Sequence, residues 1–211
     1  SMSNQGFEIG FSIAPIQTRD IDLNINLNLS FQKNKLLSLS GQYKGMEMSA
    51  APITAMGSID GAGQNGGDNN HVLYQIVGQP LGVFYLPHCE GIDKDGKYII
   101  TDLDQNGNVD TGDSGDRQIC GQAIPKAYLG WDFTFNYKNW SLAMQFNGAF
   151  GHKIYNGTSM TYSDLSNFPT YNVLADAPAR GIKNKVISDY WLENGDYVNF
   201  EYLQLSYTFN K

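Results

Sequence analysis

Residues 20–31 read DIDLNINLNLSF, and this stretch decides the fold class. Aliphatic or aromatic side chains alternate with acidic, amide or hydroxyl side chains from Ile21 to Phe31. Because successive side chains of a strand point to opposite faces, this period of two predicts a β-strand with one apolar and one polar face. It exceeds the roughly five or six residues of an ordinary strand and matches the ~9–11 residues that a tilted strand needs to cross a bilayer.

The same alternation recurs further along the chain. Residues 131–137 read WDFTFNY, residues 140–150 read WSLAMQFNGAF, and residues 203–209 read LQLSYTF. A short polar turn separates the first two, which predicts a hairpin. A further strand is predicted to begin at Phe7 and to stop at Pro15.

The predicted connections between strands are unequal in length. Residues 57–70 are rich in Gly, Asn and Asp and are predicted to form a flexible loop. Residues 93–126 are predicted to form an acidic loop and residues 151–190 a long loop, and on an outer-membrane barrel both would be extracellular. Short turns alternating with long loops are typical of outer-membrane barrels, but a soluble sandwich also alternates, so both folds stay open. Aromatic residues that would form a membrane-interface girdle at strand ends are Trp131, Tyr137 and Trp140.

Composition narrows the class of partner. The net charge of −7 argues against nucleic acid, whose phosphates need a basic surface. Aromatic residues make up 13% and charged residues only 17%, which favours a β-rich protein. The opening residues SMSNQGFEIG lack the features of a signal peptide, which leaves a cytosolic protein or an internal piece of a longer one.

Residues 102–113 read DLDQNGNVDTGD and have the spacing of an EF-hand-like calcium loop without flanking helices. Hard oxygen ligands at alternate positions suit Ca²⁺, and Gly107 falls at the sharp turn. The alternative is a hydrogen-bonded Asx-turn loop without an ion, because the last position holds Asp where Glu is usual. The predicted ligands are Asp102, Asp104, Asn106, Asn108 through its carbonyl, Asp110 and Asp113.

The two cysteines, Cys89 and Cys120, lack metal-ligand spacing, so they form either one disulfide or two free thiols. His88 adjoins Cys89 without a third ligand or a carboxylate nearby in the sequence, which favours a packed loop over a metal or nucleophile site. The chain contains no G-x-S-x-G and no phosphate-binding loop, so we do not expect an enzyme.

Aromatic rings in the long loops stand among Asn and Asp, a mixture that suits contact with sugars or peptides. The alternative is that these rings only pack the loops together. The candidates for facing substrate are Tyr155, Tyr162, Tyr171 and Trp191.

Several motifs follow one another in a fixed order between residues 6 and 209. They are NQGFEIG at the start, VGQPLGVFYL, DLDQNGNVDTGDSGDRQICGQAIP, FNYKNWSLAMQFNGAFGHKIYN and SDYWLENGDYVNFEYLQLSYTF. Together they resemble the SusC/RagA family of TonB-linked outer-membrane transporters of Bacteroidota. Asn199 and Glu201 depart from the usual residues of the last motif.

The resemblance implies that residues 6–209 are part of a large transmembrane β-barrel in the outer membrane, with an all-β fold of antiparallel up-and-down strands. It implies a fragment that cannot close the barrel alone and a plug, absent here, that engages TonB. It also implies a SusD-like surface lipoprotein as partner and glycan or peptide oligomers as substrate. Membrane lipid would contact the aliphatic face, and Asn24, Asn26 and Asn28 would face the lumen.

The alternative function is a secreted, calcium-stabilised β-sandwich that binds carbohydrate. The two hypotheses differ in the surroundings of the aliphatic side of residues 20–31. A transporter holds that side against lipid, whereas a sandwich buries it against a second sheet.

Overall fold

The computed structural model describes residues 1–59, 71–112 and 115–209. The chain divides into two compact units, which are described separately. The loop unit comprises Ser1–Ser3, Lys35–Ala123 and Lys153–Asn194, and the sheet unit comprises Asn4–Asn34, Ile124–His152 and Gly195–Lys211. Residues 60–70 of the predicted flexible loop lie outside the described residues.

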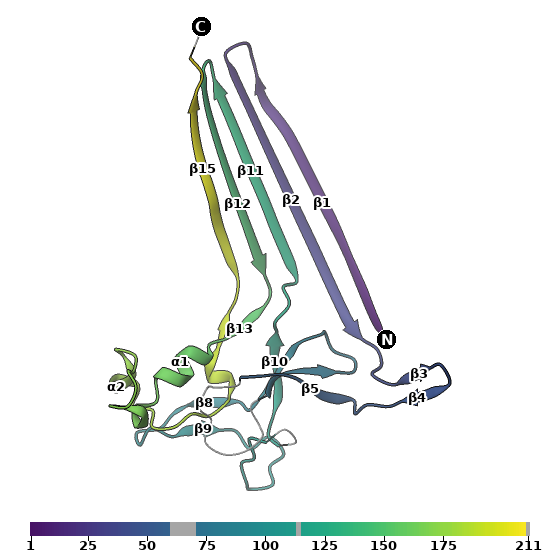
Figure 1. Ribbon diagram of the computed structural model, residues 1–211, viewed down its shortest axis with the longest axis vertical. Helices are drawn as coiled ribbons and strands as arrows, with labels where there is room; N and C mark the ends of the chain where they lie inside the picture. The colour runs from purple at the N-terminus through teal and green to yellow at the C-terminus, as the bar shows by residue number, and fades with distance from the viewer. Residues whose placement is uncertain (60–70, 113–114, 210–211) are drawn as a thin grey trace. The chain divides into compact units, whose positions relative to one another are not determined.

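The sheet unit is built around a five-stranded sheet with the strand order β1-β2-β11-β12-β15 (Figure 1). The pairs β2–β11, β11–β12 and β12–β15 are antiparallel. The strand from Phe7 does not stop at Pro15 as predicted, because β1 continues to Gln17 and a proline two residues from the end of a strand removes only one N–H from it. The strands are β1 (Met2–Gln17), β2 (Ile21–Leu36), β11 (Ala127–Tyr137), β12 (Trp140–Phe150) and β15 (Tyr197–Tyr207).

The register of the sheet aligns like residues across the strands. Residues directly opposite each other in an antiparallel pair lie on the same face. An apolar row crosses four strands at Ile25, Phe133, Met144 and Leu203. The next row is polar or amphipathic and consists of Asn26, Asp132, Gln145 and Tyr202. The period of two seen along one strand therefore becomes an apolar face and a polar face of the sheet.

The loop unit contains a four-stranded sheet of order β10-β7-β6-β5 and three short two-stranded pairs, β3-β4, β8-β9 and β13-β14. Its strands are β3 (Gly41–Tyr43), β4 (Met46–Met48), β5 (Ile53–Ser58), β6 (His71–Ile76), β7 (Val83–Leu86), β8 (Cys89–Ile92), β9 (Tyr98–Ile100), β10 (Gln118–Gln122), β13 (Lys153–Tyr155) and β14 (Leu192–Asn194). Its helical segments are α1 (Gly157–Tyr162), η1 (Leu165–Asn167), α2 (Ala177–Arg180) and η2 (Asp189–Trp191).

The hydrophobic core lies in the loop unit. Residues from β6, β7, α1 and η2 pack together there, and Met160 and Trp191 are almost fully buried. The buried members are Val72, Phe84, Leu86, Met160, Ile182, Ile187 and Trp191. Among the described residues, every helix is too short or too polar to span a membrane.

Candidate functional site

The apolar face of the sheet unit is exposed. Leu205 is 64% exposed, and Phe7 and Leu203 are each 58% exposed. In a β-sandwich these side chains would be buried against a second sheet. Their exposure contradicts the sandwich alternative and leaves a face that suits lipid.

The strand lengths suit the same surroundings. β11, β12 and β15 each contain 11 residues. At a rise of about 3.4 Å per residue such a strand is about 37 Å long, and a tilt of about 40° reduces its height to about 28 Å. That height is close to the ~25 Å apolar band of outer-membrane barrels.

Aromatic residues occupy the strand ends only in part as predicted. Tyr137 ends β11 and Trp140 begins β12, and the Trp140 ring lies 4.8 Å from that of Tyr207. Trp131 instead lies inside β11, stacked at 4.9 Å on Phe146. The girdle prediction is therefore wrong for Trp131, because β11 begins at Ala127, four residues before the alternating motif of residues 131–137.

The acidic loop brings together three carboxylates, those of Asp102, Asp104 and Asp116, with oxygens within 4.8 Å of one another. Asp116 is buried, at 3% exposure, and its carboxylate accepts hydrogen bonds from the N–H groups of Leu103 (2.7 Å) and Asp110 (2.9 Å). The bond from the Asp110 N–H is the main reason that the pKa of Asp116 lies below its usual range. Asp116 therefore holds a negative charge at the centre of the loop.

The predicted calcium ligands are placed unequally. Asp102 and Asp104 lie in the cluster, and Asp102 accepts from the N–H of Gly107, which has the positive φ expected at the sharp turn. The side chain of Asp110 instead caps the N–H of Gly112 at 2.8 Å. Asp110 lies outside the cluster of three carboxylates, and its role as a ligand stays a prediction.

The remaining predicted ligands take part in hydrogen bonds within the loop, and their roles as ligands stay predictions. Asn106 donates its side-chain N–H to Asp104 at 2.7 Å, and the N–H of Asn108 donates to the side chain of Asn106 at 2.8 Å. Asp113 lies outside the described residues. Sequence reasoning missed Asp116 as a cluster member because it follows the twelve-residue window, although its Asp-Arg pair belongs to a quoted motif.

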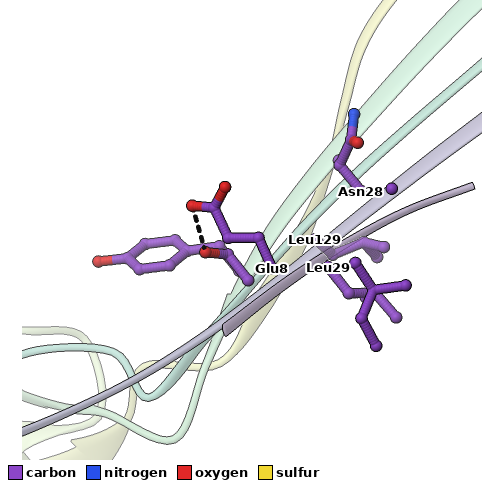
Figure 2. A pocket seen from close by; sticks show the side chains of 9 residues that line it. Glu8, Asn28, Leu29 and Leu129 are labelled. Atoms are coloured by element: carbon purple, nitrogen blue, oxygen red, sulfur yellow. Dashed lines mark hydrogen bonds between the residues drawn. The ribbon is translucent and has the colours of Figure 1, made fainter. Parts of the chain in front are cut away.

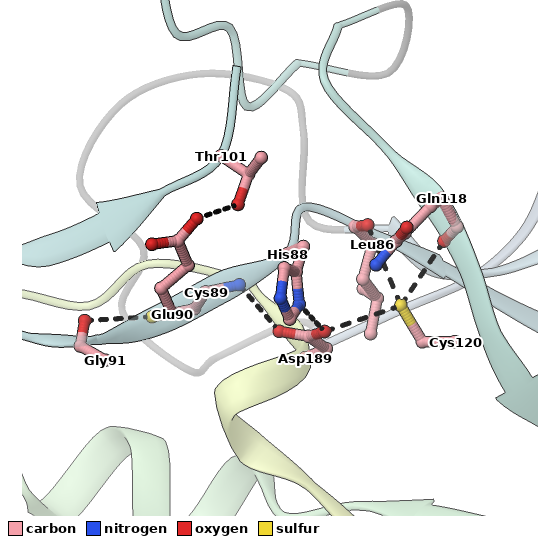
Figure 3. A network of polar contacts seen from close by, with 9 residues as sticks. All are labelled: Leu86, His88, Cys89, Glu90, Gly91, Thr101, Gln118, Cys120 and Asp189. Atoms are coloured by element: carbon pink, nitrogen blue, oxygen red, sulfur yellow. Dashed lines mark hydrogen bonds and ion pairs between the residues drawn. The ribbon is translucent and has the colours of Figure 1, made fainter. Parts of the chain in front are cut away.

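A polar network joins the start of β8 to η2 (Figure 3). The carboxylate of Asp189 lies 2.6 Å from Nδ1 of His88 and accepts a hydrogen bond from the N–H of Cys89 at 2.8 Å. It also accepts a weak hydrogen bond from the thiol of Cys120, whose Sγ is 3.8 Å away. Sequence reasoning found no carboxylate beside His88 because Asp189 is 101 residues away in the sequence. The hydrogen bond to Asp189, followed by its charge, raises the pKa of His88 above 6.5.

This network has the composition of a catalytic triad but not its electrostatics. Burial raises the pKa of the Cys120 thiol to about 12, and burial also raises the pKa of Cys89. Both cysteines are free thiols. A nucleophilic cysteine needs a lowered pKa, so the burial of these two thiols favours packing over a nucleophilic role for them.

The loop aromatics fall into two groups. Trp191 is only 2% exposed, and Tyr155 packs against the same core, where burial raises the pKa of its phenol. These two rings stabilise the loop unit, which contradicts a substrate-facing role for Trp191. Tyr162 and Tyr171 are 43% and 65% exposed and remain candidates for contact with substrate.

No family model matches the chain. SusC, a TonB-dependent receptor of Bacteroides thetaiotaomicron, is 27% identical over 99% of this chain and 21% of its own length. A TonB-dependent receptor of Formosa agariphila is 26% identical over 98% of this chain and 22% of its own length. The chain thus spans about a fifth of the length of these curated relatives.

Solved structures share the fold. The structure of the RagAB peptide transporter matches with a TM-score of 0.65 and 17% identity, over 98% of this chain and 23% of that one. The RagAB peptide importer in its closed-closed state matches with a TM-score of 0.69 and 16% identity, with the same coverage of each chain. The chain is therefore similar, along almost its whole length, to part of SusC- and RagA-type TonB-dependent receptors, as its motifs predict.

Proposed function

We propose that this chain forms part of the barrel wall of a TonB-dependent transporter that imports glycan or peptide oligomers. The observation that carries the proposal is the two-faced sheet. Its exposed apolar rows suit lipid, and its Asn-rich rows suit an aqueous lumen. Energy coupling would come from TonB acting on a plug, and a SusD-like lipoprotein would cover the extracellular side.

The experiment is a deletion of the receptor in its native bacterium, with growth measured on oligomers and on the corresponding monomers as sole nutrient. We expect slower growth on at least one oligomer and unchanged growth on its monomer, because small monomers do not need active import. Restoring the receptor should restore growth. Equal growth of the deletion strain on every oligomer would refute the transport function.

The partner is tested separately. An affinity-tagged receptor purified from mild detergent should retain a surface lipoprotein in a fixed ratio. A receptor that purifies alone from intact outer membranes would contradict this part of the proposal.

We also propose that the acidic loop binds Ca²⁺. Support comes from the convergence of Asp102, Asp104 and Asp116, whose negative charges repel one another and would be offset by a divalent cation. The loop's bend at Gly107, with the N–H groups of Asn106 and Gly107 directed at Asp102, also suits a calcium loop.

Asp104→Asn tests this proposal with little damage to the fold, since Asp104 is exposed. Millimolar Ca²⁺ should raise the melting temperature of the unmodified receptor and that of Asp95→Asn, a control on the turn between β8 and β9. The rise should shrink in Asp104→Asn. A melting temperature that does not respond to Ca²⁺ in the unmodified receptor would leave the loop as an ion-free Asx-turn loop.

A further inference from the structure

A hollow of about 420 Å³ lies across β1, β2 and β11 of the sheet unit (Figure 2). This volume lies within the roughly 300–1,000 Å³ of small-molecule sites. Six of its nine lining residues belong to the polar face, namely Glu8, Gly10, Asn28, Ser30, Tyr128 and Gly130, and the other three are Ile9, Leu29 and Leu129 of the alternate positions.

Two glycines create the hollow, on either side of Asn28. A Cβ atom at Gly130 would lie 3.8 Å from Cβ of Asn28, an ordinary contact, and one at Gly10 would lie 3.3 Å from its flexible side-chain oxygen. Neither glycine has the positive φ that other residues avoid. Backbone geometry and packing would therefore accept a side chain at Gly130, and would accept one at Gly10 after a small shift of Asn28.

Other glycines of the same sheet are different. A Cβ atom at Gly6 would lie 2.6 Å from the carbonyl oxygen of Phe31, and one at Gly148 would lie 2.7 Å from that of Tyr197. Those two positions need glycine for close approach of the strands. Glycine in the interior of a strand lowers the stability of the sheet, so Gly130 reduces stability without being needed for strand approach. The space beside Gly130 therefore suggests a ligand.

The groups around the hollow suit a sugar ring. Glu8 accepts a hydrogen bond from Ser30 at 3.1 Å and keeps further lone pairs for a ligand hydroxyl. The ring of Tyr128 is 40% exposed, and its hydroxyl accepts from Gln32 at 3.3 Å, which orients the ring. An aromatic ring beside a carboxylate and an amide provides stacking together with hydrogen bonds to hydroxyl groups.

The charge of the polar face adds selectivity. Its carboxylates are partnered by neutral donors, as in the bond from Asn26 to Asp132 at 2.7 Å and the bond from Asn199 to Glu201 at 3.0 Å. Among the described strands of the sheet, this face contains no Lys or Arg to offset the charge. The acidic side chains are Glu8, Asp22, Asp132 and Glu201.

We propose that the hollow binds one uncharged sugar unit of the transported oligomer and that the surrounding carboxylates exclude polyanionic oligomers. This inference rests on the proposed transport function, which places the polar face toward the lumen. Carboxylates on the polar face repel a negatively charged oligomer and do not repel a neutral one, and this difference discriminates between the two.

The first test fills the hollow with Gly130→Thr in the receptor that contains this chain. The control is Ala143→Thr, on the same face but outside the hollow lining. Binding of neutral hexasaccharides, namely cellohexaose, xylohexaose and mannohexaose, is measured by calorimetry. Gly130→Thr should weaken the tightest of these by about tenfold, the effect of losing one stacked and hydrogen-bonded ring, while its melting temperature stays equal or rises.

The second test removes one charge with Glu8→Gln, against Glu47→Gln in β4 as the control. Hexagalacturonate should bind the unmodified receptor more weakly than the neutral probes, and Glu8→Gln should narrow that difference. Binding of hexagalacturonate as the tightest probe, no binding of any neutral probe, or equal effects of Gly130→Thr and its control would overturn the proposal. Oligomer-dependent growth would be unaffected by those outcomes, so failure of the subsite is distinguishable from failure of the transport function.

Discussion

The orientation of the sheet is tested most directly by placing arginine on either face of one strand. Met144 and Gln145 are neighbours near the middle of β12, and their side chains lie on opposite faces. Met144 belongs to the apolar row with Phe133 and Leu203, whereas Gln145 lies opposite Asp132 on the polar face. Met144→Arg and Gln145→Arg therefore make the same chemical change in two different surroundings.

The expected costs differ because the middle of β12 would lie near the bilayer midplane. An arginine on the lipid face there destabilises a barrel by about 2–4 kcal/mol, which reduces the folded-to-unfolded ratio roughly 30-fold to 700-fold. An arginine on the lumen face stays hydrated and, beside Asp132, should change stability by less than about 1 kcal/mol.

The assay is reversible urea unfolding of the receptor in lipid vesicles, with tryptophan fluorescence as the signal. The midpoint for Met144→Arg should fall clearly below those of Gln145→Arg and the unmodified receptor. Equal midpoints for the two variants, or a larger loss for Gln145→Arg, would show that the apolar face does not lie against lipid.

Three further predictions concern the loop unit. Trp191→Ala should destabilise it by about 3–5 kcal/mol because the ring is buried, while Tyr171→Ala should change it little, as measured by hydrogen exchange. Gly115→Ala should destabilise the acidic loop by about 1–3 kcal/mol, because the added Cβ atom would clash with the carbonyl oxygen of Asp110. Gly41→Ala is the control, since a Cβ atom there meets nothing within 4 Å, and the protection of the loop amides from hydrogen exchange measures the difference. The pKa of His88 is raised by Asp189, so their ion pair stabilises the folded state fully below pH 6.5, and this stabilisation is lost as the pH rises through the folded-state pKa of His88. The melting temperature should therefore fall as the pH rises above 6.5, and Asp189→Asn should reduce that fall.

The strands were predictable because their signal is local. Alternation between Ile21 and Phe31 reports which residues share a face, and it needs no knowledge of the neighbouring strand. The register could not be predicted in this way. Ile25 lies opposite Phe133, yet a shift by two residues would keep every side chain on its face and satisfy the same pattern.

The acidic loop and the polar network show the same limit on sequence reasoning. Asp102 and Asp104 were predictable as a pair because both fall at ligand positions of a twelve-residue calcium loop. Asp116 follows that twelve-residue window in the sequence and joins the cluster only because the chain folds back. Asp189 meets His88 from a segment 101 residues away, a contact that depends on how the core packs.

The edges of the sheet explain why its strands need further neighbours. Within the described part of the chain, β1 and β15 are each paired on one side only. About half of the backbone N–H and C=O groups of the 11-residue strand β15 point to its open side, and each unpaired group in hydrocarbon costs several kcal/mol. The sum is on the order of tens of kcal/mol, more than the roughly 5–15 kcal/mol that stabilises an ordinary domain. An apolar face in lipid is therefore compatible with these strands only if further strands pair with both edges, and relatives about five times as long as this chain contain enough residues to provide them.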